Sequence, residues 1–268
     1  MDMINRQVTV PGAKLHYEIR GVGPLLLVIG SPMAAAEFAP LADALASDHT
    51  VVTYDPRGHG SSAISGPGDD ATPDQRADDI VAILDDLGAA DADVFGSSGG
   101  AVTGLALVSR HADRVRTLVA HEPPLLELLP DAEEQRAATD AIVDTFRTEG
   151  FGPAWHRFMV NAGFDLPSPG PDAPAPPTPT GQQLAEAARF FEHELRPTTR
   201  YLPDIPALSA GNVIVGIGED SGHLVTYRTS VALAELLGIK PVDFPGDHGG
   251  FLGAPAPFAD RLGQALAR

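Results

Sequence analysis

The sequence contains no cysteine, which excludes disulfide bonds, thiolate metal sites and a cysteine nucleophile. Lysine is also scarce, with Lys14 and Lys240 as its two occurrences. The 18 basic residues are outnumbered by 36 acidic ones, and the formal net charge is -18. A surface of this sign repels phosphate backbones and anionic lipids, so we expect neither a nucleic acid nor a membrane as a partner.

Long hydrophobic runs are missing as well. The longest, Pro24–Gly30, is far too short to span a bilayer. The N-terminus has no apolar segment behind a basic stretch, so we expect no signal peptide and a cytoplasmic location. With 268 residues, the chain is long enough for one buried core plus an insertion.

Short apolar segments, typical of strands buried on both faces, alternate with segments of helical periodicity. The alternation indicates βαβ units and therefore an α/β fold with a mostly parallel sheet. The expected strands are Val8–Val10, Leu15–Ile19, Leu25–Ile29, Val51–Tyr54, Ala92–Phe95, Val115–Ala120, Asn212–Ile217 and Pro241–Phe244. The expected helices are Phe38–Ala46, Pro73–Leu87, Ala101–Arg110, Asp131–Thr148, Pro153–Val160, Gln182–Leu195, His223–Leu237 and Ala256–Ala267.

The alternation is interrupted in the middle of the chain, where no buried strand is indicated from Pro123 to about Pro206. We therefore expect a core of residues 1–123 and 206–268 and a helical insertion over residues 124–205. Within the insertion, Pro167–Pro179 is rich in proline and is expected to be an extended or disordered loop.

The segment Gly96–Gly100 reads Gly-Ser-Ser-Gly-Gly and fits the pattern G-x-S-x-G. It follows an expected strand and precedes an expected helix, as a nucleophile elbow requires. On such a turn the serine hydroxyl projects above the sheet, and bulky neighbours would clash with the adjacent strand and helix. We therefore predict Ser98 as a nucleophile. The alternative is an ordinary glycine-rich loop between a strand and a helix.

A serine hydroxyl needs a base to remove its proton. His248 follows the last expected strand, Pro241–Phe244, and has glycines on both sides within Pro245–Gly250. This position late in the chain predicts His248 as the general base. The alternative for a single histidine is a surface position or a hydrogen-bonded place in the core.

The third member of such a triad accepts the other imidazole proton and fixes the tautomer. Two positions compete for this role. Glu122 follows the expected strand that ends at Ala120, whereas Glu219 and Asp220 follow the next strand, where the acid usually lies. We favour Glu122, keep Asp220 as the alternative acid, and rank Glu219 below both. Asp220 also fits a cap of the following helix.

An oxyanion hole needs two backbone N–H groups directed at the developing negative charge. One is expected from Gly99, directly after the nucleophile. The other is expected from the loop after Leu25–Ile29, where we nominate Ser31. The alternative is that this loop is only a tight turn.

The segment Tyr54–Ser62 combines charged residues with two glycines. Such a cluster holds a loop in place through hydrogen bonds. We therefore predict a structural rather than a catalytic role for Asp55 and His59.

The pattern D-x-R-G-H-G-x-S, the elbow and the late P-G-x-H-G occur in this order, and together they resemble the α/β-hydrolase superfamily. The resemblance covers Val8–Pro123 and Pro206–Arg268. It implies a mostly parallel eight-stranded sheet flanked by helices, with a helical cap between strands six and seven. The cap and the loop after Ser31 would then supply the substrate-binding side chains, the alternative being simple packing of the cap. These candidates are Met33, Trp155, Phe158, Met159, Phe190 and Phe191.

Some features depart from the usual pattern of this superfamily. The oxyanion loop reads Ile29-Gly30 in place of the usual His-Gly. A serine at the elbow argues against haloalkane dehalogenases and epoxide hydrolases, whose ester intermediate forms on a carboxylate. An acid at Glu122 is similar to the arrangement in some lactone-hydrolysing members, such as zearalenone hydrolase, and in some dehalogenases.

The resemblance and the residues together predict a serine hydrolase that cleaves a carboxylic ester or lactone of a small apolar substrate through an acyl-enzyme. No metal and no organic cofactor are expected. The alternatives are a cofactor-free perhydrolase or haloperoxidase-like activity, and a non-hydrolytic ligand-binding or biosynthetic protein on the same scaffold. A homodimer is compatible with the sequence.

Overall fold

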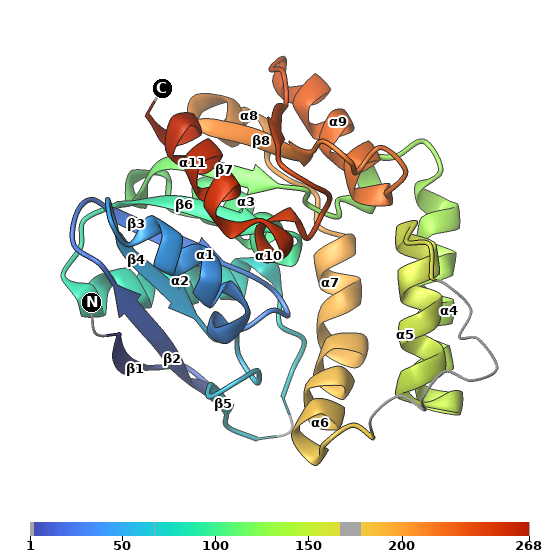
Figure 1. Ribbon diagram of the computed structural model, residues 1–268. Coiled ribbons are helices and arrows are strands. Elements are labelled where there is room, and N and C mark those ends of the chain that lie inside the picture. The colour runs from blue at the N-terminus through green and yellow to red at the C-terminus, as the bar shows by residue number, and fades with distance from the viewer. Residues whose placement is uncertain (1–2, 67, 167–177, 268) are drawn as a thin grey trace.

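The computed structural model describes residues 3–66, 68–166 and 178–267. Its centre is a sheet whose strands follow the order β1-β2-β4-β3-β6-β7-β8-β9 (Figure 1). The strands are β1 (Ile4–Val10), β2 (Ala13–Arg20), β3 (Leu25–Ile29), β4 (Thr50–Tyr54), β5 (Ala63–Ile64), β6 (Ala92–Ser97), β7 (Val115–His121), β8 (Val213–Gly218) and β9 (Val242–Phe244).

Most strand pairs in this sheet are parallel. Strand β2 pairs antiparallel with both β1 and β4, and every later pair from β4 to β9 along the sheet is parallel. The prediction of a mostly parallel sheet flanked by helices is confirmed. The eight expected strands form the continuous path, and the short β5, which pairs with β2, is a ninth strand that the sequence did not reveal. Two residues are too few to show an alternating pattern.

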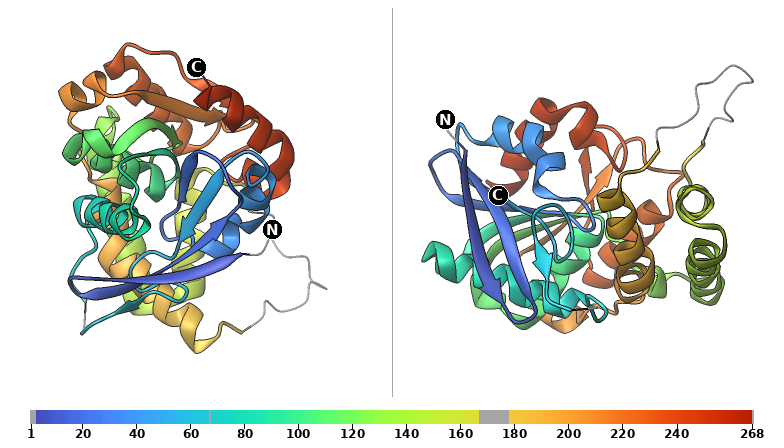
Figure 2. Two further views of the ribbon diagram at one scale, coloured as in Figure 1. Left: turned by 90° about the vertical axis from the view of Figure 1, so that its left-hand side faces the viewer. Right: turned by 90° about the horizontal axis from the view of Figure 1, so that it is seen from below.

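Helices cover both faces of the sheet (Figures 1 and 2). One face packs against α2 (Pro73–Leu87), α3 (Gly99–Arg110) and α9 (Val225–Leu237), and the other against α1 (Ala39–Leu45), α10 (Gly250–Gly253) and α11 (Pro255–Leu266). The short turns η1 (Ala35–Phe38) and η2 (Ala112–Arg114) precede α1 and β7. Strand β3 is apolar throughout because both of its faces are covered by helices. Leu27 and Ile29 pack on the first face, whereas Leu26 and Val28 pack on the second.

The segment between β7 and β8 is helical in the part that the structure describes, as expected. Its elements are η3 (Leu126–Leu128), α4 (Ala132–Glu149), α5 (Phe151–Ala162), α6 (Gly181–Arg189), η4 (Phe190–Glu194), α7 (Leu195–Thr199) and α8 (Ile205–Ala210). Figure 1 shows α4 with α5, and α6 with α7, as two helical columns beside the core. Residues 167–177 of the predicted proline-rich loop lie outside the described residues. The boundaries of a cap at 124 and 205 stay a prediction.

The helix expected over Gln182–Leu195 is longer than predicted and irregular. It runs from α6 into α7 through η4, which is a π-helical turn. Around this turn the insertion has a small core of its own, which includes Ile142, Phe191 and Leu195. Such π turns are rare within α-helices, and they often occur at functional sites.

A buried ionic cluster joins the insertion to the core. Glu194 of η4 is 1% exposed, and both of its oxygens lie 3.0 Å from Nε2 of His59. The same carboxylate lies 3.4 Å from the guanidinium groups of Arg76 and Arg189. Arg76, fully buried in α2, also donates to Thr198 of α7 over 3.0 Å. A buried carboxylate requires such partners, because removing its charge from water without them is costly.

Asp55 holds the neighbouring loop, which agrees with the structural role expected for it. Its side chain accepts hydrogen bonds from the N–H groups of Ala35 at 2.8 Å and Ser61 at 2.7 Å. No helix among the described residues is long and apolar enough to cross a membrane.

Candidate active site

Ser98 lies on the sharp turn between β6 and α3. Its backbone has φ 56° and ψ -124°, a conformation that an L-residue adopts at a cost of about 1–3 kcal/mol. Among the described residues, Glu122 is the one other non-glycine residue with positive φ, at 51°. The strained turn is fixed from both sides, because the N–H of Ser98 donates to the carbonyl of His121 and its carbonyl accepts from Ala101, both at 2.9 Å.

The glycines around Ser98 are explained by close approach of backbone. A Cβ on Gly96 would lie 2.5 Å from the carbonyl oxygen of Gly100. A Cβ on Gly100 would collide with the carbonyl oxygen of Ile29 in the adjacent strand. Only glycine therefore allows β6 to turn this tightly into α3 while the hydroxyl of Ser98 faces outward.

The other two triad candidates come from the same edge of the sheet. Ser98, Glu122 and His248 follow β6, β7 and β9, which are parallel strands, so their carboxyl ends lie together. Nδ1 of His248 lies 2.7 Å from Oε2 of Glu122. Ser98 and His248 line one cavity. With Nδ1 bonded to the carboxylate, Nε2 is the ring nitrogen available to the serine.

Glu122 is fully buried, and its carboxylate is held by donors from β8 and α9. The N–H of Gly218 donates to Oε1, and the hydroxyl of Thr226 donates to Oε2, both over 2.8 Å. Burial alone would raise the pKa of Glu122, but the hydrogen bond to His248 and the nearby His121 outweigh it and lower the pKa to about 2. The group is therefore an anion at neutral pH, and Nδ1 of His248 donates to it.

The competing acids are not brought to the histidine. Glu219 and Asp220 are exposed, and their N–H groups donate to the carbonyls of Phe244 and Gly246. Asp220 does not cap the following helix either, because α9 begins at Val225 with Leu224 in the N-cap position. That alternative was wrong, since four residues separate Asp220 from Val225, the first residue of the helix.

His121 lies directly behind His248, a placement that the sequence did not reveal. The two rings are nearly parallel, with an angle of 23° and 6.3 Å between centroids. His121 is fully buried, and neither ring nitrogen has a hydrogen-bond partner among the described residues. Burial among Phe95, Phe244 and Phe258 lowers its pKa to about 4, so this imidazole is neutral at pH 7.

The two residues nominated for the oxyanion hole lie next to each other. A Cβ on Gly99 would be 2.5 Å from the carbonyl oxygen of Ser31, and both residues line the cavity. Gly99 is the first residue of α3, where the N–H groups have no partner within the helix and attract negative charge. Their role as oxyanion donors stays a prediction.

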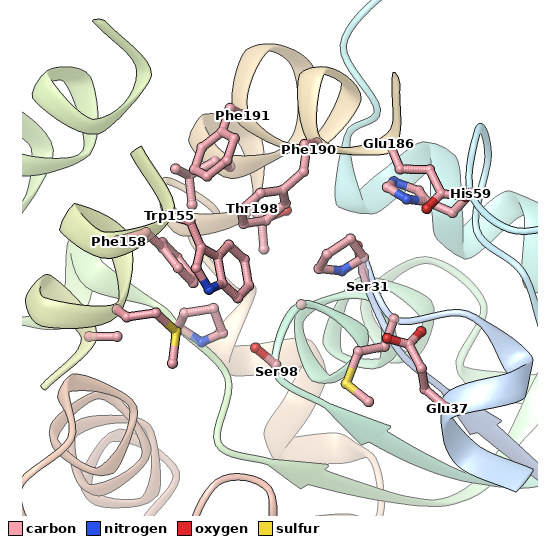
Figure 3. Close-up of a pocket in the computed structure, with 18 of the residues that line it drawn as sticks. Ser31, Glu37, His59, Ser98, Trp155, Phe158, Glu186, Phe190, Phe191 and Thr198 are labelled. Carbon is pink, nitrogen blue, oxygen red and sulfur yellow. The ribbon is translucent and has the colours of Figure 1, made fainter. Parts of the chain in front are cut away.

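The cavity has a volume of about 1280 Å³ and lies between the carboxyl edge of the sheet and the insertion. Every side chain nominated for substrate binding lines it: Met33, Trp155, Phe158, Met159, Phe190 and Phe191. Figure 3 shows Ser98 between two unlike ends of this cavity. The rings of Trp155 and Phe158 lie at one end, and Glu37 and His59 lie at the other.

Comparison with known proteins gives a consistent result. A family model described as "alpha/beta hydrolase fold" matches residues 23–202. The uncharacterized hydrolase YraK of Bacillus subtilis (strain 168) is 33% identical over 277 residues, which cover 100% of this chain and 98% of that protein. The putative carbamate hydrolase RutD of Caulobacter vibrioides is 42% identical over 117 residues, 41% of this chain and 42% of that protein.

A likeness to solved structures supports the same fold. The enol-lactonase from Burkholderia xenovorans LB400 superposes with a TM-score of 0.65 at 21% identity, covering 98% of this chain and 100% of that chain. At this level of identity the likeness concerns the arrangement of the backbone.

Proposed function

Because the chain belongs to the α/β hydrolase fold family, we propose that it is a serine hydrolase that cleaves carboxylic esters or lactones. One observation carries the proposal: Ser98, on a strained positive-φ turn, shares a cavity with His248, whose Nδ1 is bonded to buried Glu122. These are the parts of a nucleophile, a base and an orienting acid.

In the first step, Oγ of Ser98 attacks the carbonyl carbon of the ester while Nε2 of His248 takes the serine proton. The carbonyl oxygen becomes an oxyanion, which the N–H groups of Gly99 and Ser31 stabilise. When the tetrahedral intermediate collapses, the carbon–oxygen bond to the alcohol breaks, and His248 gives its proton to the departing alkoxide. The acyl group remains on Ser98. For a lactone, the alcohol remains attached to the acyl group.

In the second step, water replaces the alcohol. His248 accepts a proton from the water as it attacks the acyl-enzyme, and the same N–H groups hold the second oxyanion. His248 then returns the proton to Oγ of Ser98, and the carboxylic acid leaves. Glu122 keeps the proton of the resting imidazole on Nδ1 and stabilises the imidazolium in both steps. Neither step requires a metal ion or a redox partner.

The relatives add limited support to this proposal. One relative is named a putative carbamate hydrolase, and one structural neighbour is an enol-lactonase. Both names describe hydrolysis at a carbonyl carbon, the chemistry that the triad candidates perform. The largely aromatic end of the cavity favours an ester or lactone with an apolar part over a highly charged substrate.

A fluorophosphonate probe tests the proposal, because it reacts with an activated serine. We expect the probe to label the wild-type protein, with the added mass on Ser98 in a peptide map. The variant Ser98→Ala should fold, as judged by circular dichroism, but neither label nor hydrolyse p-nitrophenyl butyrate. If Ser98→Ala hydrolysed the ester at the wild-type rate, Ser98 would be excluded as the nucleophile. Tight ligand binding without labelling would favour a receptor-like or biosynthetic role instead.

A further inference from the structure

The charge on the cavity wall has one sign. Of the described residues, three contribute carboxylates to the lining: Glu37, Glu186 and Asp247. Among the described lining residues no lysine or arginine is present, and the basic groups there are the imidazoles of His59 and His248. Both imidazoles are already bonded to buried carboxylates of the protein. Residues 167–177, outside the described part, contain no lysine or arginine in their sequence.

Two of these carboxylates are held at the end of the cavity that lies away from the aromatic rings (Figure 3). Glu186 accepts hydrogen bonds from the N–H of Gly60 at 3.0 Å and from the amide of Gln182 at 2.9 Å. Glu37 accepts one from the N–H of Ala34. Each glutamate has its donor within the protein, so neither depends on a cation for its position.

The opposite end is a wall of aromatic rings in mutual contact. The centroids of Trp155 and Phe158 are 5.5 Å apart, those of Phe158 and Phe190 5.4 Å, and those of Phe190 and Phe191 5.0 Å. Phe191 is fully buried in the core of the insertion, so the apolar surface that a ligand meets is formed by Trp155, Phe158 and Phe190. A cavity of about 1280 Å³ is also much larger than a short acyl chain would fill.

We propose that this cavity selects uncharged esters or lactones with a bulky apolar group, and discriminates against substrates that carry a carboxylate. The inference rests on the proposed function and narrows its substrate class. The bulky group lies against the aromatic wall, and the carbonyl lies at Ser98. The remainder of the substrate extends toward Glu37 and Glu186.

The discrimination follows from electrostatics. A substrate carboxylate that enters this cavity loses hydration and meets fixed negative charges, and no lysine or arginine among the described lining residues compensates for them. For a separation of roughly 6 Å and an effective dielectric constant of about 20, the repulsion from one glutamate corresponds to about a 100-fold loss of kcat/KM. Solvent in the open part of the cavity reduces this, so we expect a loss on the order of 10- to 100-fold.

Three esters test the inference: p-nitrophenyl 4-phenylbutyrate, the 4-phenylbutyrate of 3-carboxy-4-nitrophenol, and p-nitrophenyl acetate. In the second ester the carboxylate is on the alcohol part, which extends toward Glu37 and Glu186. Burial raises the pKa of Glu37, and the neighbouring Glu186 adds to the rise, so the assays are run at pH 8 to keep the carboxylate charged. We expect kcat/KM for p-nitrophenyl 4-phenylbutyrate to exceed the values for both other esters by about tenfold or more.

The double variant Glu37→Gln/Glu186→Gln should reduce the ratio of kcat/KM between the neutral and the carboxylated ester by about fivefold or more. The matched control is Glu149→Gln/Glu235→Gln, which removes the same charge from exposed positions outside the cavity lining and should leave the ratio unchanged. Glutamine can accept the same N–H donors, so both double variants should fold.

The outcomes separate this inference from the proposed function. If no ester is hydrolysed and Ser98 is not labelled, the proposed function fails. If Ser98 is labelled and the carboxylated ester is hydrolysed as well as the neutral one, only the inference fails. A ratio that does not change in Glu37→Gln/Glu186→Gln, or that changes equally in the control, would also overturn it.

Discussion

The N–H of Gly218, at the end of β8, donates a hydrogen bond of 2.8 Å to Oε1 of Glu122, at the end of β7. In the sequence these two strand ends compete for the role of supplying the acid. In the structure they cooperate: β7 carries the carboxylate, and β8 and the following helix supply donors to it. Thr226 of α9 completes the arrangement at Oε2.

The two acids are separated by conservative substitutions. Glu122→Gln removes the charge that stabilises the imidazolium of His248. The glutamine also no longer fixes the tautomer of this histidine, so we expect kcat to fall by about 10³- to 10⁴-fold. Asp220→Asn changes an exposed side chain outside the cavity and should leave kcat within about twofold of the wild type. Steady-state hydrolysis of a p-nitrophenyl ester measures both. A large loss confined to Asp220→Asn would assign the acid to β8.

Thr226 is predicted to act as a positioning residue. Thr226→Val keeps the size of the side chain but removes the donor to Oε2 of Glu122, so the carboxylate can turn away from His248. A hydrogen bond to a charged group contributes about 1.5 kcal/mol or more, so we expect kcat to fall by about tenfold with little change in KM.

The variant Thr226→Ser is the control for this experiment, because it keeps the hydroxyl and loses only a methyl group. We expect Thr226→Ser to recover most of the wild-type kcat. Equal losses in both variants would show that packing of the methyl group, and not the hydrogen bond, is what matters at this position.

His121 should make the fold sensitive to mild acid. Its pKa is about 4 in the folded protein and about 6.5 unfolded, so the unfolded chain binds more protons between these values. Protonation of this residue therefore does not lower the free energy of unfolding above pH 6.5. As the pH falls toward 4, it lowers the free energy of unfolding by about 3 kcal/mol in total. Below pH 4 the loss from this group is constant.

The variant His121→Phe should abolish this component of the acid destabilisation. It also removes two buried nitrogens that have no hydrogen-bond partner in the part of the chain that the structure describes. Urea unfolding between pH 7 and pH 4 measures the difference. His223→Asn, a change at an exposed histidine, serves as the control and should follow the wild type. The same pH dependence in His121→Phe and the wild type would exclude His121 as its source.

The sequence predicted features that depend on local pattern. Pro73–Leu87 begins with Thr72 as a cap and ends before a left-handed Gly88, and the observed helix has the predicted bounds. Ser98 and His248 could be predicted in the same way, because each lies in a glycine-rich segment directly after an expected strand. The family and the mostly parallel sheet were predictable from these local signals together.

Other features of the site depend on distant residues and leave no local signal. Thr226 lies 104 positions from Glu122 and looks like any threonine in the first turn of a helix. His121 appears in the sequence only as the end of a strand, and its stacking on His248 arises from the packing of three phenylalanines. A helix was predicted over Gln182–Leu195, but nothing in that segment indicated that the helix would widen into a π turn at Phe190–Glu194.

The π turn at η4 makes this part of the chain sensitive to the deletion of a single residue. A π turn holds one residue more than the α-helix around it, and each residue of an α-helix advances by about 100°. Deletion of a single codon within this turn would rotate one half of the helix against the other. Glu194 could then no longer meet Arg76 while Phe190 and Phe191 kept their directions. The extra residue of the π turn is therefore needed for two contacts at once during evolution: the aromatic rings at the cavity, and the ion pair between Glu194 and Arg76 that holds the insertion to the core.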